Sequence, residues 1–164
     1  MRFGSTGIPT AGCRVGWRRW KMRANAARHA IVANVGNFHT LAFRYSDGAI
    51  TGVFEHHTNE LTSRQFENLI AQLADGTLTN DAVFNSKGHG ALLFDTRAQP
   101  LDSVAIVGPR RGMLLRSRYR PYFATPYGDM MLAGCFGLVR TYAVLNKDAR
   151  GEIERALDAA REIV

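Results

Sequence analysis

Apolar and polar positions alternate through the first part of the chain in the manner of β-strands. Residues 31–45 and 49–54 form two strand-like runs, and Ser46-Asp47-Gly48 between them is typical of a hairpin turn because glycine readily takes a positive φ. Small and hydrogen-bonding residues interrupt the first run at positions 34–40. The pattern therefore predicts a strand, a tight turn at 34–40, a second strand and a hairpin to a third.

A helical period replaces this alternation after residue 62. Thr62 or Ser63 can cap the start of the helix, Gln65 lies three residues after Thr62, and Asp75-Gly76 is suited to end it. The apolar positions of the segment recur at helical spacing and are Phe66, Leu69, Ile70 and Leu73. We expect this face to pack on the sheet.

Shorter elements are predicted next. A second helix is expected at 79–86, Gly88-His89-Gly90 breaks the pattern as a loop, and strands are expected at 92–94 and 103–107. The last of these strands leads directly into Gly108-Pro109-Arg110-Arg111, a sharp turn that carries two cations.

Two helices are predicted at the C-terminal end. Asp129 can cap a helix over 130–145, in which Gly134 and Gly137 would allow close packing against a neighbour. An amphipathic charged helix is expected over 148–164.

The alternation of strand and helix signals predicts an α/β domain with a mixed sheet and flanking helices. We assign residues 1–29 to a basic leader that is peripheral or disordered, 30–145 to the domain and 146–164 to a C-terminal helix. The residues expected to form the core are Val32, Leu41, Phe43, Val53, Phe66, Leu69, Ile70, Leu73, Val104, Ile106 and Leu132.

Charge is distributed unevenly along the chain. The 164 residues carry a formal net charge of +7, yet residues 1–30 hold seven basic residues and no acidic one, which leaves 14 basic and 14 acidic residues after position 30. The body is therefore neutral, which argues against a nucleic-acid-binding domain. The leader could be a surface-binding arm, a transit-like extension or sequence outside the fold, and we favour the last.

Cysteine content and hydropathy set further bounds. Cys13 and Cys135 are the two cysteines, far apart in sequence, so neither a disulfide framework nor a cysteine metal site is expected. No stretch reaches the roughly 18 apolar residues of a membrane span, and the leader lacks the apolar core of a secretory signal. We expect a soluble, cytoplasmic protein without a membrane or nucleic-acid partner.

The turn at 34–40 is a candidate anion site. Gly36 can take a positive φ and let a ligand approach the main chain, while Asn37, His39 and Thr40 can offer side-chain hydrogen bonds beside backbone N–H groups. A plain bend between two strands would carry similar residues, so both interpretations stay open at this point.

Histidines and an acid offer a metal site as an alternative. Glu55, His57 and His89, with His39 as a further candidate, could bind zinc, manganese or iron if their segments converge. His56 and His57 are adjacent on a predicted strand and would face opposite sides, so at most one of them joins a site. We expect His39 to orient its turn and His89 to lie in a loop over a cleft.

Five separated blocks carry a resemblance to a known family. The blocks resemble an uncharacterised prokaryotic family labelled pyruvate formate-lyase activating enzyme, over about residues 30–145. In order, they are residues 33–43, residues 52–58, Gly88-His89-Gly90-Ala91, Gly108-Pro109-Arg110-Arg111 and residues 128–137.

The family label and the cysteines disagree. Enzymes that activate pyruvate formate-lyase use radical S-adenosylmethionine chemistry, and their iron–sulfur cluster needs three closely spaced cysteine ligands. Cys13 and Cys135 cannot supply them. We therefore expect no iron–sulfur cluster and treat glycyl-radical activation as an inherited name.

The same family is distantly similar to the C-terminal half of actin-like ATPases, which have ribonuclease H-like domains. This resemblance implies a phosphate hairpin at 34–40, with main-chain groups of Gly36 and Asn37 and the hydroxyl of Thr40 on the phosphates of ATP or another nucleotide with magnesium. Asn34 stands where the superfamily usually has an acid.

The resemblance also implies an adenosine turn and a helix that closes the nucleotide cleft. Gly108 falls on the turn, Arg110 or Arg111 would contact base, ribose or phosphate, and Asp129 begins the helix segment. Pro109 stands where a second glycine is common.

A half-domain of this type implies a missing N-terminal lobe. Apolar surface that normally faces the lobe would then favour self-association, so we expect a dimer. The third interpretation of the chain, beside nucleotide binding and a metal-binding enzyme or module, is a non-catalytic interaction module.

Overall fold

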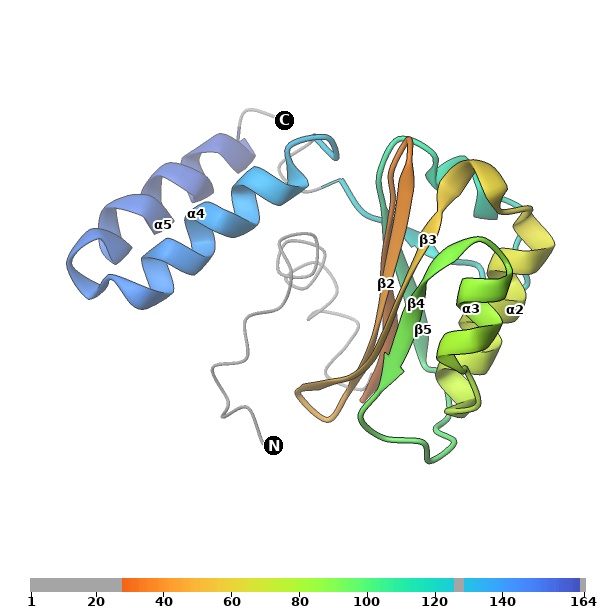
Figure 1. Cartoon of the computed structure of the whole chain (residues 1–164). Coiled ribbons are helices and arrows are strands. Elements are labelled where there is room, and N and C mark those ends of the chain that lie inside the picture. Colours follow the sequence, from red (N-terminus) through yellow and green to blue (C-terminus); the bar gives the residue numbers. More distant parts are fainter. Residues whose placement is uncertain (1–27, 126–128, 163–164) are drawn as a thin grey trace.

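The structure is a computed structural model that describes residues 28–125 and 129–162. Its centre is a six-stranded mixed sheet with strand order β4-β3-β2-β1-β5-β6 (Figure 1). The strands are β1 (His29–Val35), β2 (His39–Ser46), β3 (Ala49–His57), β4 (Gly88–Leu93), β5 (Ser103–Val107) and β6 (Tyr122–Phe123). The α-helices are α2 (Ser63–Asp75), α3 (Asn80–Asn85), α4 (Ala133–Leu145) and α5 (Lys147–Glu162), and the 3-10 helices are η1 (Thr58–Glu60) and η2 (Arg111–Leu114).

Strand direction divides the sheet into two parts. The first four strands pair antiparallel in sequence order, whereas β5 adds parallel to β1 and β6 adds parallel to β5. The ends of β1, β3 and β5 and the starts of β2 and β4 therefore lie at one edge of the sheet, which we call the upper edge. The α/β class with a mixed sheet and flanking helices is confirmed.

The two hairpin turns use different backbone geometry. Asp47 and Gly48 have φ of 46° and 86°, as the predicted turn requires. At the other turn, the N–H of Gly36 donates to the carbonyl of His39 at 2.9 Å, and φ of Gly36 is not positive. The expected left-handed conformation is therefore wrong, and glycine is needed because a Cβ would lie 2.8 Å from the His39 oxygen.

Helix α2 forms where the sequence predicts it. The side chain of Thr62 accepts from the N–H of Gln65, and the Gln65 side chain accepts from the N–H of Thr62, which completes a capping box. Gly76 ends the helix with φ of 72°. A side chain there would collide with the carbonyl of Thr96, 2.3 Å from the Cβ position.

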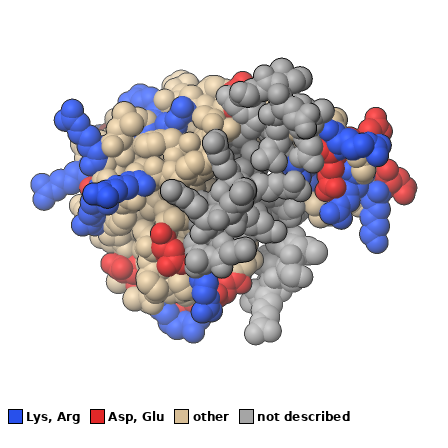
Figure 2. All heavy atoms as spheres, turned by 180° about the vertical axis from the view of Figure 1, so that it is seen from behind, with Lys and Arg blue, Asp and Glu red and all other residues tan. Residues whose placement is uncertain are grey.

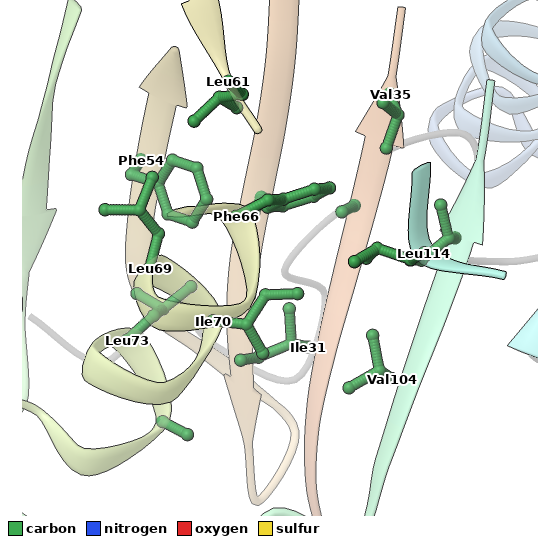
Figure 3. Close-up of a cluster of buried hydrophobic side chains, with 14 of the residues drawn as sticks. Ile31, Val35, Phe54, Leu61, Phe66, Leu69, Ile70, Leu73, Val104 and Leu114 are labelled. Carbon is green, nitrogen blue, oxygen red and sulfur yellow. The ribbon is translucent and has the colours of Figure 1, made fainter. Parts of the chain in front are cut away.

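The core lies between α2 and one face of the sheet, with Ile31, Val35 and Phe54 against Phe66 and Ile70 (Figure 3). Six predicted core residues are buried, namely Phe66, Leu69, Ile70, Leu73, Val104 and Ile106. The predicted core strand residues Val32, Leu41, Phe43 and Val53 are half-buried on the other face instead.

The misassigned core residues have a simple cause. Strand side chains alternate between two faces, and β1, β2 and β3 carry apolar residues on both, so the pattern left open which set meets the helices. Ile31, Ala42 and Phe54 belong to the set that does. Leu132 was also expected in the core, but it is 46% exposed just before α4.

The C-terminal elements differ from prediction in detail. Asp129 accepts from the N–H of Met131 at 2.7 Å, so it caps a turn, and α4 begins only at Ala133. Among the residues that the structure describes, no atom lies within 4 Å of a Cβ placed on Gly134, so they do not provide the close packing expected at that glycine. The predicted leader lies outside the described residues except for 28–29.

Helices α4 and α5 pack against each other and lie on the far side of the sheet from α2 and α3 (Figure 1). Basic and acidic side chains are intermingled over this helical pair (Figure 2). Within the described ranges, none of the helices has the length and apolar character needed to cross a bilayer.

Candidate metal centre

Three histidines from three adjacent strands meet at the upper edge of the sheet. His39 begins β2, His57 ends β3 and His89 lies near the start of β4. The ring centroids are 5.1 Å apart for His39 and His57, 4.9 Å for His39 and His89, and 4.3 Å for His57 and His89. One ring nitrogen from each lies within 4.8 Å of the others. We call these three residues the histidine cluster.

Strand register explains the first contact of the cluster. His39 and His57 are directly opposite each other in the β2–β3 pair, so their side chains share one face. That face is opposite to the one that α2 covers, since the neighbouring residues Thr40 and His56 are buried on the helix side.

An irregularity in β4 brings the third histidine. Glu55 pairs with Gly90 and His56 pairs with Gly88, which leaves His89 as an extra residue between them. Gly90 has φ of 129°, and a Cβ on Gly88 would lie 2.5 Å from Val83. Gly90 thus allows the backbone conformation at the bulge, and Gly88 allows the close approach of α3. The expectation that Gly88-His89-Gly90 is a loop is wrong.

An acid lies beside the cluster. Oε1 of Glu55 is 3.4 Å from Nδ1 of His39, and both side chains are partly exposed. Glu60 is also near this edge, but its carboxylate pairs with Lys87 at 2.9 Å, and that hydrogen bond lowers the pKa of Glu60. Glu55 is therefore the carboxylate in contact with the cluster among the described residues.

His56 has a structural role on the other face. It is fully buried, with Nε2 3.1 Å from the hydroxyl of Ser86 and Nδ1 3.0 Å from the carbonyl of His57. The prediction that His56 and His57 face opposite sides is confirmed.

Some residues of the predicted phosphate hairpin are buried in the protein interior, and others lie at its surface. Thr40 is fully buried, and its hydroxyl is 2.9 Å from that of Thr58. The N–H of Gly36 is bonded within its turn. A ligand would have to displace these bonds to use either group. Asn34 and Asn37 are exposed.

The turn after β5 lies against the end of β1. Gly108 has φ of 103°, and a Cβ there would be 2.4 Å from the carbonyl of Val35 and 2.6 Å from Oδ1 of Asn34. The N–H of Arg110 donates to the Val35 carbonyl at 3.0 Å, and its guanidinium donates to Asn59 at 3.2 Å. The structure thus brings Asn34, Gly108 and Arg110 to the same upper edge as the cluster.

The remaining candidates are placed differently. The guanidinium of Arg111 donates to the carbonyl of Gly108 at 3.5 Å, which folds this side chain back on its own turn. Asp129 caps the turn before α4, and its described hydrogen bonds stay within that segment.

The histidine cluster has the chemistry of a metal site. Three imidazole nitrogens are a ligand set found in zinc sites that leave a fourth position for water or substrate. Zinc–nitrogen bonds of about 2.0 Å place ligand nitrogens roughly 3.3 Å apart in a tetrahedral site. The ligand nitrogens of the cluster lie within 4.8 Å of one another, so metal binding would draw them together by up to about 1.5 Å.

The comparison with protein families matches residues 12–113 to the family described as "Putative pyruvate format-lyase activating enzyme (DUF1786)". The chain belongs to this family. The match covers the histidine cluster, Glu55, Asn34 and Gly108, and it ends before α4 and α5. It differs from the range of about 30–145 suggested by the sequence blocks. No curated protein and no solved structure matches the chain.

Three of the blocks that carry the resemblance to this family each bring one histidine to the cluster. The sequence analysis grouped His57 and His89, with His39 as a further candidate, as ligands of one possible site, but the convergence of their segments could not be derived from the sequence. The missing information was the register of β2, β3 and β4. The available signal for the irregularity in β4 was the glycine on each side of His89, because glycine within a strand often marks a bulge.

Proposed function

We propose that the chain is a metal-binding protein whose centre is His39, His57 and His89. The observation that carries this proposal is the convergence of three ligand nitrogens within 4.8 Å from three neighbouring strands. Zinc fits this nitrogen set best, and manganese or iron are the other candidates.

The position of the cluster favours a reactive centre over a purely structural one. His39 and His89 are exposed and His57 is half-buried, so a fourth coordination position would face solvent. A metal in such a site can activate a bound water or polarise a substrate oxygen. The reaction class that follows is metal-assisted hydrolysis or hydration.

Metal analysis of untagged protein tests this proposal. We expect about one zinc or manganese per chain after purification or after titration of the chelator-treated protein, and loss of binding in His57→Ala and His89→Ala. His29→Ala is the matched control because His29 bonds to Ser46 at the other edge of the sheet. Metal-free protein that binds neither zinc nor manganese would refute the proposal.

A second candidate function is nucleotide binding by a ribonuclease H-like, actin-like half-domain with ATP and magnesium. The observation that favours it is the contact of the Gly108 turn with Asn34, because it joins the candidate adenosine turn to the candidate phosphate hairpin. The mixed sheet with helices is consistent with such a fold. The expected partner is an N-terminal lobe or a second copy of the chain.

Isothermal titration with ATP, ADP and AMP in magnesium buffer tests the second candidate. Arg110→Ala should weaken nucleotide binding, whereas Arg64→Ala, a change at an exposed position on α2, should not. Equal affinity in both variants would remove Arg110 from the site, and no binding by the wild-type chain would count against nucleotide binding by this half alone.

A further inference from the structure

The register of the sheet places one more polar side chain on the face of the histidine cluster. Asn34 pairs with Leu41, and Leu41 pairs with Glu55, so these three residues form a row across β1, β2 and β3. His39 and His57 form the next row toward the upper edge. Asn34 is exposed, and in the described ranges its side chain makes no hydrogen bond.

The turn after β5 keeps space for this amide. A Cβ on Gly108 would lie 2.6 Å from Oδ1 of Asn34, so a side chain at position 108 would occupy the place that the amide uses. The half-buried side chain of Leu41 separates Asn34 from Glu55 and forms an apolar floor between them. A ligand could therefore lie over Leu41 between the amide of Asn34 and the histidine cluster.

The spacing fits a small anion. Residues placed diagonally on adjacent strands, as Asn34 and His39 are, lie roughly 7–8 Å apart. Because strand side chains stand roughly perpendicular to the sheet, the ends of the Asn34 and His39 side chains are separated by a similar distance. A metal–oxygen bond of about 2 Å, the width of one oxyanion and a hydrogen bond of about 2.9 Å together span such a gap. A divalent ion held by neutral imidazoles keeps its two positive charges, and Arg110 adds another at the same edge, so positive charge exceeds the single negative charge of the Glu55 carboxylate beside His39.

We infer that the metal centre binds an oxyanion, phosphate or carboxylate, with one oxygen on the metal and another accepting a hydrogen bond from the amide of Asn34. This inference rests on the proposed metal function and names the ligand class of that site. Asn34 then contacts the ligand directly and contributes nothing to metal affinity.

Titration of the zinc-loaded chain with inorganic phosphate, and separately with acetate, tests the inference. We expect Asn34→Leu to weaken phosphate binding by about tenfold, as for loss of one hydrogen bond. Asn34→Gln, which keeps an amide, should recover part of the affinity. Asn68→Leu is the matched control, since Asn68 is exposed on α2, which covers the other face of the sheet. A stronger response to acetate than to phosphate would assign the site to carboxylates.

The outcomes separate the inference from the metal proposal. Unchanged zinc affinity with weaker anion binding in Asn34→Leu supports both. Unchanged anion affinity in a folded Asn34→Leu, or anion binding that depends on Arg110 and not on zinc, overturns the inference and leaves the metal site standing. Failure of the wild-type chain to bind zinc overturns both.

Discussion

Glu55 is positioned to hold one ring of the histidine cluster in a fixed orientation. Its Oε1 lies 3.4 Å from Nδ1 of His39, so in our proposal Nε2 is the nitrogen of His39 that binds the metal. A carboxylate that accepts from the other nitrogen of a ligand histidine fixes the tautomer and makes the ring a better ligand.

We therefore predict that Glu55→Gln weakens zinc binding by about 10- to 100-fold, measured by competition with a coloured chelator. Glu152→Gln changes an exposed acid on α5 and should leave zinc affinity unchanged. Equal affinities in the two variants would show that Glu55 does not orient the ligand.

Arg44 is a buried cation that links the sheet to the end of α2 and to the segment after β4. It is 3% exposed on β2, and burial lowers its pKa. Its guanidinium donates to the hydroxyl of Thr51 and to the carbonyls of Leu73, Ala74, Asp95 and Arg97. These bonds give hydrogen-bond donors to backbone carbonyls at the end of α2 and in the segment after β4.

Arg44→Met should keep most of the apolar contact and remove every donor. Because buried carbonyls then lose their partner, we predict a loss of about 3 kcal/mol in the free energy of unfolding by urea. Arg64→Met, at an exposed position on α2, should change it by less than about 0.5 kcal/mol. A similar small effect at both positions would contradict the structural role of Arg44.

Asp95 gives the fold a defined response to acid. Its carboxylate accepts from the backbone N–H and the guanidinium of Arg97, and these bonds hold its pKa well below the ordinary value of 3.8. Above that value both folded and unfolded chains are ionised and the bonds stabilise the fold. As pH falls below about 4, the unfolded chain takes up the proton first, so stability declines.

Melting temperatures measured from pH 6 to pH 3 should therefore fall less steeply for Asp95→Asn than for the wild-type chain. The comparison is best made with Asp81→Asn as a control, because Asp81 is an exposed acid on α3. Parallel curves for all three proteins would mean that the Asp95 bonds do not contribute.

At the scale of elements, local signals explain what the sequence could predict. Helix α2 was predictable from end to end because its capping box, its apolar period and Gly76 all lie within the segment itself. The hairpin at Asp47-Gly48 was predictable for the same reason. Strand β4 was not, since its glycines disfavour a strand and its form depends on pairing with β3 and packing of α3.

The same distinction applies to the candidate site. Residue types and adjacent positions were enough to propose His57 and His89 as ligands and to separate His57 from His56. Glu55, which was also proposed as a ligand, lies beside His39 and outside the three-histidine group. The convergence of His57 and His89 with His39 depends on the cross-strand register, which shifts between Arg44 and Tyr45 and again between Glu55 and His56, and the sequence pattern showed neither irregularity. The burial of Thr40 follows from the same register.

Helix α5 contains a glycine with no steric reason for its presence among the described contacts. The nearest atom to a Cβ on Gly151 is the end of the flexible Arg155 side chain, 4.0 Å away. Glycine costs a helix interior roughly 1 kcal/mol relative to alanine.

Gly151→Ala should therefore stabilise the α4–α5 pair, by up to about 1 kcal/mol in thermal or urea unfolding. Gly108→Ala provides the opposite case, because φ of 103° and the carbonyl of Val35 leave no room for a side chain there. A destabilised Gly151→Ala variant would reveal a contact of this glycine that the folded chain needs.

At the scale of the whole molecule, the upper edge of the sheet gathers the candidate groups, and α4 presents apolar surface elsewhere. Leu138, Tyr142 and Leu145 follow helical spacing and are 73%, 55% and 72% exposed. Helix α4 is apolar around most of its circumference, and its extensive described contacts are with α5. A helix of this composition is normally covered on more than one side.

We predict that this face mediates self-association, so that the chain is a dimer at micromolar concentration in light-scattering measurements after gel filtration. Leu138→Lys combined with Leu145→Lys should give a monomer, because two charges cannot be buried in an apolar contact without partners. Leu115→Lys is the matched control, since Leu115 is 72% exposed but lies after η2, away from the helical pair. A wild-type chain that stays monomeric would refute self-association. A dimer that survives the double substitution while Leu115→Lys disrupts it would place the contact away from α4.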